Sequence, residues 1–186
     1  LCGSASNPGP TCGYVILLND NLGGVNTNGI DIAANYRLRT GMGNWVFRMS
    51  ETYVAKYEYQ NEKNGPWVQN VGSYEGTGPI FRNQFTASAH WTMGPWSAGI
   101  VNHYKSGYVD QDLGVTPRPG VGSYSTWDLY GSWAPNKQLT ITAGVKNVLD
   151  KAPPHTEQGA TFQVGYDPRF TDPFLRTFYL RGQYRF

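Results

Sequence analysis

The chain has 186 residues, of which 13 are acidic and 15 are lysine or arginine, and its formal net charge is +2. This length suits one domain, and a near-neutral charge without a polybasic block does not favour nucleic acid as a partner. Glycine (23 residues) and tyrosine (13 residues) are abundant, which favours aromatic-rich strands separated by glycine-rich turns. No apolar run reaches the roughly 18 residues that a membrane-spanning helix needs.

The two cysteines, Cys2 and Cys12, flank a short segment rich in proline, glycine, serine and asparagine. We expect them to form a disulfide, which would place this segment in the periplasm or at the cell surface. Two free thiols are the alternative, since a metal site needs more ligands than this loop offers. The first residues have no signal-peptide features, so we expect the chain to begin inside a longer protein.

Alternation of apolar and polar residues predicts seven long strands. The first is expected over residues 14–39, with a bulge or bend near Gly23 and Gly24. The second is expected over 44–59, where Glu51 interrupts the apolar face and indicates a bulge, a register shift or a partner. The other five are predicted at 80–93, 96–108, 123–134, 138–149 and 174–186.

The last strand shows the alternation most clearly. One face carries Phe178, Leu180, Gly182, Tyr184 and Phe186, and the other carries Thr177, Tyr179, Arg181, Gln183 and Arg185. In a soluble sandwich the apolar face would be the core, whereas in an outer-membrane barrel it would face lipid. One strand does not distinguish the two.

The connections between the strands do distinguish them. Short segments (40–43, 94–95 and 135–137) alternate strictly with long ones (60–79, 109–122 and 150–173). Outer-membrane barrels have short periplasmic turns and long outer loops, and a sandwich has no reason to keep that order. Four tryptophans flank the short turns, where an interfacial belt belongs: Trp45, Trp91, Trp96 and Trp133. The sequence therefore predicts an all-β antiparallel meander of seven transmembrane strands.

Several segments resemble the carboxyl-terminal barrel of TonB-dependent outer-membrane receptors. They are VKNVLDKAPP (145–154), VGYDPRFTDPF (164–174), the terminal RTFYLRGQYRF (176–186), and Gly29, Ile30 and Asp31 in an upstream strand. The resemblance implies a wall segment of a barrel of about 22 strands around an amino-terminal plug. Such receptors import scarce ligands, such as ferric siderophores, cobalamin or oligosaccharides, with energy from the TonB complex.

The resemblance also implies the surroundings of the chain. Residues 1–186 would be the carboxyl-terminal part of the barrel, without the plug and the earlier strands, as a multi-pass protein of the outer membrane of a Gram-negative cell. Expected partners are outer-membrane lipid, the protein's own plug and remaining strands, the TonB complex and the barrel assembly machinery. Tyr184 and Phe186 would belong to the barrel-assembly signal.

The polar face predicts an excess of positive charge. It carries Arg37, Arg39, Arg48, Lys56, Arg82, Lys105, Lys146, Arg181 and Arg185 against Asp31 and Asp128. A wall of one sign attracts an anionic passenger, such as a ferric siderophore. Alternatively, these cations pair with acidic residues of the plug. The candidate ligand contacts are Trp67, Tyr74, Tyr166 and Phe170 in the long loops, with Arg82 and Lys105.

Two other readings stay open. A soluble all-β carbohydrate-binding module would bury Trp127, Leu129 and Trp133 in a dry core between two sheets. A small self-contained outer-membrane barrel would pair its last strand with its first. An enzyme is not expected, because His90, His103 and His155 are scattered and no catalytic or metal-binding motif occurs, and no cofactor is expected.

Overall fold

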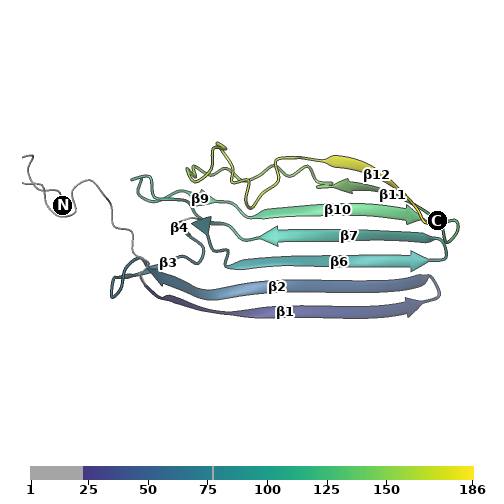
Figure 1. Cartoon of the computed structure of the whole chain (residues 1–186), viewed down its shortest axis with the longest axis horizontal. Helices are drawn as coiled ribbons and strands as arrows, with labels where there is room; N and C mark the ends of the chain where they lie inside the picture. Colours follow the sequence, from purple (N-terminus) through teal and green to yellow (C-terminus); the bar gives the residue numbers. More distant parts are fainter. Residues whose placement is uncertain (1–22, 77) are drawn as a thin grey trace, which may run out of the picture.

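The computed structural model describes residues 23–76 and 78–186, and Cys2 and Cys12 lie outside this part. Seven long strands form one antiparallel sheet in sequence order (Figure 1). They are β1 (Val25–Thr40), β2 (Gly43–Gln60), β6 (Asn83–Met93), β7 (Trp96–Lys105), β10 (Tyr124–Trp133), β11 (Leu139–Lys146) and β12 (Thr177–Tyr184). The predicted meander is confirmed. In the described part of the chain, no helix is long and apolar enough to cross a membrane.

The register places side chains of one kind on the same face across the sheet. Ile100 of β7 lies opposite Leu129 of β10, which lies opposite Val145 of β11, and Val145 lies opposite Phe178 of β12. In the alternate rows the paired residues are mainly polar or small, as in Ser132 and Thr142, three residues along, whose hydroxyls are 2.7 Å apart. Because directly paired residues point the same way, the sheet has one apolar and one polar face.

The two rims of the sheet differ as predicted. The short turns at 41–42, 94–95 and 134–138 lie at the rim where the carboxyl terminus also lies (Figure 1). The amide of Arg185 donates to the carbonyl of Gln138 at 2.9 Å and fixes the chain end beside the last of these turns. The long connections gather at the opposite rim and include five short strands: β3 (Trp67–Gln69), β4 (Tyr74–Glu75), β5 (Gly78–Pro79), β8 (Tyr108–Val109) and β9 (Gly120–Val121).

Two irregularities predicted from the sequence are not found at their predicted positions. Gly23 and Gly24 precede β1, and the register between β1 and β2 shifts instead between Asn28 and Gly29. Gly29 suits that position because the backbone carbonyl of Tyr53 would lie 2.4 Å from a Cβ there. The ladder is regular at Glu51, which pairs with Ile32 on one side and Phe85 on the other. The expected bulge or register shift at Glu51 was therefore wrong, and a partner for its side chain stays a prediction.

Strand β11 ends three residues before the predicted boundary, because Asn147 has a φ of +49°. The buried Asn147 side chain donates to the carbonyl of Lys151 at 2.8 Å and accepts from the amide of Lys151 at 2.9 Å. The amide of Asn147 donates to Asp128 at 2.9 Å. The segment Asn147-Val148-Leu149-Asp150 is thus a tight turn that closes the strand.

The buried apolar side chains of the described residues lie at the loop rim and not under the sheet. Tyr74, Tyr108 and Val121 form a buried cluster, with Phe81 packed against it. The sheet is open, since β1 and β12 are its two edges and are not paired with each other. A small self-closed barrel is therefore contradicted. No second sheet covers the apolar face in the described part, where Leu129 and Trp133 are each 39% exposed, so the dry sandwich core is contradicted too.

Candidate ligand-binding site under the long loops

A buried carboxylate joins the second and third long loops. Asp110, which is 2% exposed, accepts a hydrogen bond from the hydroxyl of Thr156 at 2.7 Å and from the amide of Glu157 at 2.8 Å. The amide of Gln111 also donates to Asp110, at 2.9 Å. A buried charge is tolerated only where several donors face it. Asp110 therefore fixes residues separated by more than forty positions in one arrangement.

Arg118 joins the second loop to the first. Its guanidinium forms an ion pair with Glu75, and it donates to the carbonyl of Tyr74 at 2.9 Å and, through Nε, to the carbonyl of Asp110 at 2.8 Å. A planar guanidinium suits this role because its donors point in fixed directions toward several acceptors. All three long loops are thereby connected.

The third loop turns inward over the polar face. Asp167, which is 2% exposed, pairs with Arg169 at 2.6 Å and accepts from the amide of Arg169 at 3.0 Å. Arg169 also donates to the hydroxyl of Tyr74 at 2.9 Å. Asp167 and this hydroxyl raise the pKa of Arg169 above its usual value. The turn places Phe170 against Phe81, with ring centroids 5.2 Å apart.

Lys105, at the loop end of β7, holds this turn from below. Its ammonium group donates to the carbonyl of Phe170 at 2.6 Å and lies 5.8 Å from the centroid of the Phe81 ring. Tyr108 completes the cluster, and burial raises its pKa to about 12. A phenol in such surroundings stays neutral and apolar at ordinary pH.

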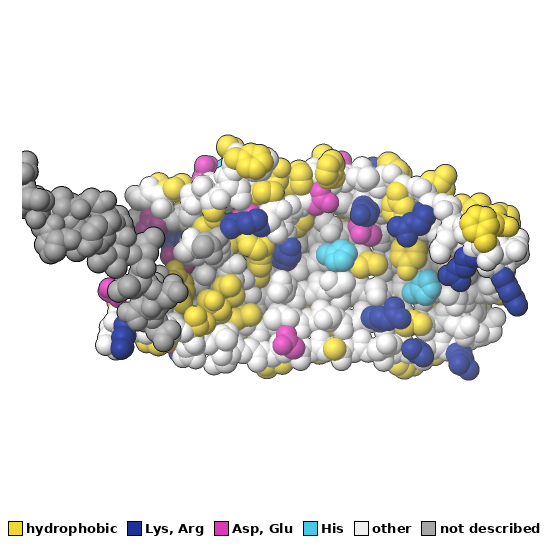
Figure 2. All heavy atoms as spheres, in the orientation of Figure 1, with side chains coloured by type: hydrophobic (Ala, Val, Ile, Leu, Met, Phe, Trp, Pro, Cys, Tyr) yellow, Lys and Arg dark blue, Asp and Glu magenta, His cyan; other side chains and the backbone are white. Residues whose placement is uncertain are grey.

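A pocket of about 620 Å³ lies between the inward turn and the polar face of the sheet. Residues 168–172 form its roof, and the floor comes from β2, β6, β7, β10 and β11. The floor carries hydroxyl, amide and charged groups: Ser50, Thr52, Gln84, Thr86, His103, Thr126, Asp128 and Lys146. Figure 2 shows this face, with both histidine and charged side chains between the two rims.

His103 lies on this floor. Its Nδ1 is 3.3 Å from the hydroxyl of Thr86, and its Nε2 is 3.9 Å from Asp128. These polar neighbours and the surrounding hydroxyls could bind an oxygen-rich ligand through hydrogen bonds. In the described residues, no three His, Cys, Asp or Glu side chains are grouped as a metal site.

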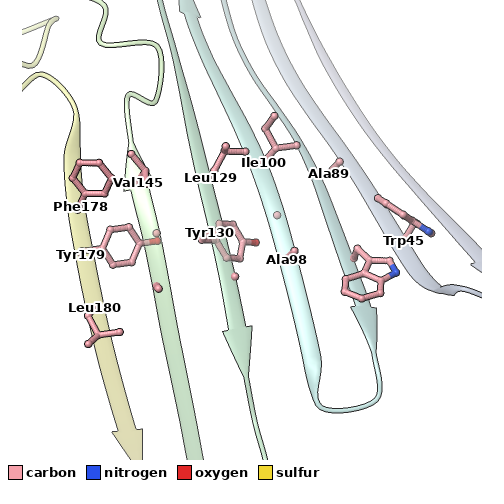
Figure 3. A pocket seen from close by; sticks show the side chains of 15 residues that line it. Trp45, Ala89, Ala98, Ile100, Leu129, Tyr130, Val145, Phe178, Tyr179 and Leu180 are labelled. Carbon is pink, nitrogen blue, oxygen red and sulfur yellow. The ribbon is translucent and has the colours of Figure 1, made fainter.

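A larger groove of about 940 Å³ lies on the opposite, apolar face (Figure 3). Its side chains are mainly aliphatic and aromatic, with Phe178, Val145, Leu129 and Ile100 in one row and Trp45 at one end. Small residues such as Ala98 and Ala143 form its floor. Such a surface lacks the convergent polar groups that specify a ligand, so the pocket on the polar face is the better candidate site.

The structure brings together some of the predicted ligand contacts and separates others. Lys105 and Phe170 meet at the pocket, and Arg82 is exposed near the same rim. Trp67 is 48% exposed in β3, and Tyr166 is half-buried, with its hydroxyl 3.2 Å from Gln163. Neither residue lines this pocket.

Tyr74 does not fit its predicted role. It is 4% exposed because it packs in the loop cluster, so it cannot be a first contact for a ligand arriving from solution. Sequence analysis missed His103, Thr86 and Thr126, which face the pocket. Their position on the polar face of predicted strands was the available signal, but nothing local showed that residues 168–172 lie above them.

The sequence matches the model of the family described as TonB dependent receptor-like, beta-barrel, over residues 3–148. A solved structure of a variant of the ferric enterobactin receptor from Pseudomonas aeruginosa has the same fold, with a TM-score of 0.55 and 17% sequence identity. The match covers 86% of this chain and 22% of that receptor, so the chain spans about a fifth of the receptor's length. A search of curated proteins gave no match. The match over most of the sequence shows that this chain belongs to the TonB-dependent receptor β-barrel family.

Proposed function

We propose that the chain forms part of the wall of an outer-membrane importer, in which the TonB complex supplies the energy for uptake of a scarce ligand. The family and the open sheet support this proposal, because a sheet with two unpaired edges needs further strands to close in a membrane. The remaining strands and a plug inside the barrel would complete the protein. The apolar face would contact outer-membrane lipid.

One observation carries the proposal. A polar pocket lies on one face of the sheet under loops that are connected by Asp110, Arg118 and Lys105, while the opposite face is apolar. A barrel wall needs these two surfaces, one for the ligand path and one for the membrane. A binding module without a membrane role would not expose Leu180 to 77% and Phe178 to 72%.

We propose an anionic ferric siderophore as the ligand. The excess of lysine and arginine on the polar face supports an anionic passenger, and hydroxyl groups in the pocket suit an oxygen-rich ligand. Trp67, Tyr166 and Arg82 stay candidates for first contact. Phe170 would form part of the roof of the pocket, and Lys105 would hold this roof from the floor. Tyr184 and Phe186, whose rings are 5.2 Å apart at the end of β12, stay the proposed signal for the barrel assembly machinery.

The test is uptake by the full-length protein in iron-limited cells. We expect growth on a ferric siderophore, loss of growth when TonB is deleted, and no growth on the same siderophore without the receptor. Arg82→Glu and Lys146→Glu should weaken siderophore affinity by about tenfold each, since each replaces attraction by repulsion. Transport that persists without TonB would contradict the proposed mechanism. Uptake of cobalamin or an oligosaccharide in place of a siderophore would agree with the proposed importer function and would contradict the proposed ligand.

Arg82 and Lys146 are better choices for this test than Lys105. Lys105 is bonded to the carbonyl of Phe170, so its substitution would also loosen the loop cluster. Arg82 and Lys146 form no ion pair with the described residues. The protein is proposed to act by transport and not as an enzyme.

A further inference from the structure

Glu51 interrupts the apolar face of the sheet. It pairs with Ile32 of β1 on one side and with Phe85 of β6 on the other. Its neighbours on the same face of β2, Met49 and Tyr53, are apolar or aromatic. Because directly paired residues point to the same side of a sheet, the Glu51 carboxylate lies on the face that the proposed function places against lipid.

Glu51 lies far from the short-turn end of this face. The tryptophans near the short turns include Trp45, which pairs with Leu38. Leu38 lies six residues from Ile32, the partner of Glu51, and this separation is about 20 Å along β1. At a strand tilt of about 45°, it corresponds to about 14 Å of membrane depth. A glutamate side chain is too short to reach water on that side.

The register shift between β1 and β2 shows where the apolar band ends toward the loops. The shift moves Lys56 from the polar face, where the alternation predicted it, to the face of Glu51, because Lys56 pairs with Asn28. Lys56 forms an ion pair with Glu58 at 2.6 Å. Asn28 lies four residues along β1 from the partner of Glu51, which is about 10 Å of depth. Together the two depths match the roughly 25 Å height of the apolar band of a barrel.

The Glu51 carboxylate has no partner among the described residues. It is half-buried, and its side chain forms no hydrogen bond or ion pair with them. A carboxylate within the apolar part of a membrane is costly, and such a residue usually marks a functional contact. Lipid does not supply the missing donor, because acyl chains have none and headgroups lie outside the apolar band. A protein segment at the same depth fits the carboxylate better.

The receptor itself is a poor source of this donor. Within the described residues of the seven long strands, Lys56 is the only lysine or arginine on the apolar face, and it is already paired. A second copy of these strands therefore offers no free cation. A strand that paired with the free edge of β1 would lie about 10 Å from Glu51, with Ile32 between them. A different membrane protein is the partner that remains.

The surface beside Glu51 has a shape that suits such a contact. A shallow groove of about 350 Å³ is lined mainly by apolar side chains, among them Ala34, Met49, Ala87 and Trp127. Ala34 and Ala87 are the pairing partners of Met49 on its two sides. Small residues let another backbone come close. The aliphatic part of a lysine or arginine would lie along this groove while its charged end reaches Glu51.

We propose that Glu51 and this groove form a docking surface, within the membrane, for another membrane protein that presents a lysine or arginine at the same depth. The inference rests on the proposed function, since it needs the apolar face to lie in a membrane. It goes beyond that function because it gives the importer a protein neighbour in the plane of the outer membrane.

Photo-crosslinking in cells that carry the full-length protein tests the contact. A photo-crosslinking residue at position 49 keeps Glu51 in place, and β1 and β6 flank this position. Position 129 is the matched control, because Leu129 and Met49 are 39% and 37% exposed on the same face. We expect position 49 to capture a peptide with lysine or arginine from another membrane protein, and position 129 to capture lipid. Capture at position 49 of lipid alone, of a second copy of the chain or of another strand of the same barrel would overturn the proposal.

The adduct at position 49 should depend on the charge of residue 51. Glu51→Gln should lower its yield about tenfold, because the variant removes the charge and keeps the shape. Glu51→Asp should keep most of the yield. Glu51→Lys should abolish the adduct, and replacing the captured lysine or arginine of the partner by glutamate should restore it. An unchanged yield in the Glu51→Gln variant would contradict the role of the carboxylate.

Glu51→Leu separates docking from a structural role of Glu51. The purified variant in detergent should unfold at the same urea concentration as the parent protein or a higher one, because leucine suits an apolar face. Its adduct in cells should fall as in the Glu51→Gln variant. A less stable purified variant would place the partner of Glu51 within the receptor and overturn the proposal. Lipid capture at position 129 tests the proposed function separately, and its absence would contradict a wall that lies in the membrane.

Discussion

Gly99 lies under the ring of Tyr130, and this contact makes glycine necessary in the middle of β7. A Cβ at position 99 would lie 2.4 Å from the Tyr130 ring, whose hydroxyl is 3.0 Å from Nδ1 of His90. Gly144 has the same relation to Tyr179 on the next pair of strands. The tyrosine rings thus cover the space that two glycines leave free.

Gly99→Ala should therefore destabilise the assembled protein by about 1–3 kcal/mol, because the ring must move and its bond to His90 is lost. Urea unfolding of the full-length protein in detergent would measure the change. Gly131→Ala is the matched control. Position 131 lies on the other face of the sheet from position 99, and the atom nearest to a Cβ at position 131 is 3.9 Å away. Equal destabilisation by both substitutions would contradict the packing argument.

Asp110→Ala should loosen the second and third long loops together. The substitution leaves the hydroxyl of Thr156 and the amides of Glu157 and Gln111 without their acceptor, at about 3 kcal/mol in total. Limited proteolysis should cut within residues 147–176 faster than in the parent protein. Asp112→Ala is the control, because its exposed carboxylate accepts, among the described residues, only from the amide of Gly114. Slow cleavage in the Asp110 variant would contradict this role.

The loop cluster should lose stability at high pH. Burial raises the pKa of Tyr108 from about 10 to about 12, so between these values the unfolded loop releases a proton that the folded loop retains. Stability is then complete below about pH 10 and falls as the pH rises toward 12. Tyrosinate absorbance should show a late-titrating group that disappears in Tyr108→Phe. Ionisation of all tyrosines near pH 10 would contradict the burial.

At the scale of the elements, Asn147 sets the end of β11. Its positive φ and its two bonds to Lys151 stabilise the turn that leads into the third loop. Asn147→Ala should cost about 2 kcal/mol, since it loses these bonds and keeps a backbone conformation that alanine disfavours. Asn147→Gly should cost less, because glycine adopts that conformation freely. Urea unfolding should give this order, and the reverse order would show that the backbone conformation is unimportant.

The long strands could be predicted from sequence because their alternation is local. The polarity of each residue from Phe178 to Tyr184 indicates which face of the sheet it lies on. The register then places residues of the same kind side by side on neighbouring strands. The arrangement of the loops could not be predicted from the sequence, because it depends on contacts between residues that are distant in the chain. Arg118 with Glu75 and Asp110 with Thr156 are such pairs. No local pattern shows that residues 168–172 cover the polar face.

At the scale of the whole molecule, the two faces of the sheet suit different surroundings. The apolar face carries stacked tryptophans near the short turns, such as Trp96 and Trp133 with centroids 5.9 Å apart. The polar face carries the pocket near the long loops and Arg37, Arg39 and Arg48 toward the short turns. Both edge strands, β1 and β12, are exposed along most of their length, which agrees with a wall that continues into further strands.

The most direct test is a spin-label scan of β10 in the full-length protein in lipid bilayers. Trp127, Leu129, Gly131 and Trp133 lie on the apolar face, and Thr126, Asp128, Tyr130 and Ser132 lie on the polar face. We predict that accessibility to oxygen, which concentrates in lipid, is high at the first four positions and low at the other four, with a period of two. Protection from oxygen at residues 127, 129 and 133 would indicate a dry protein core and would contradict the assignment of this chain to a membrane barrel wall.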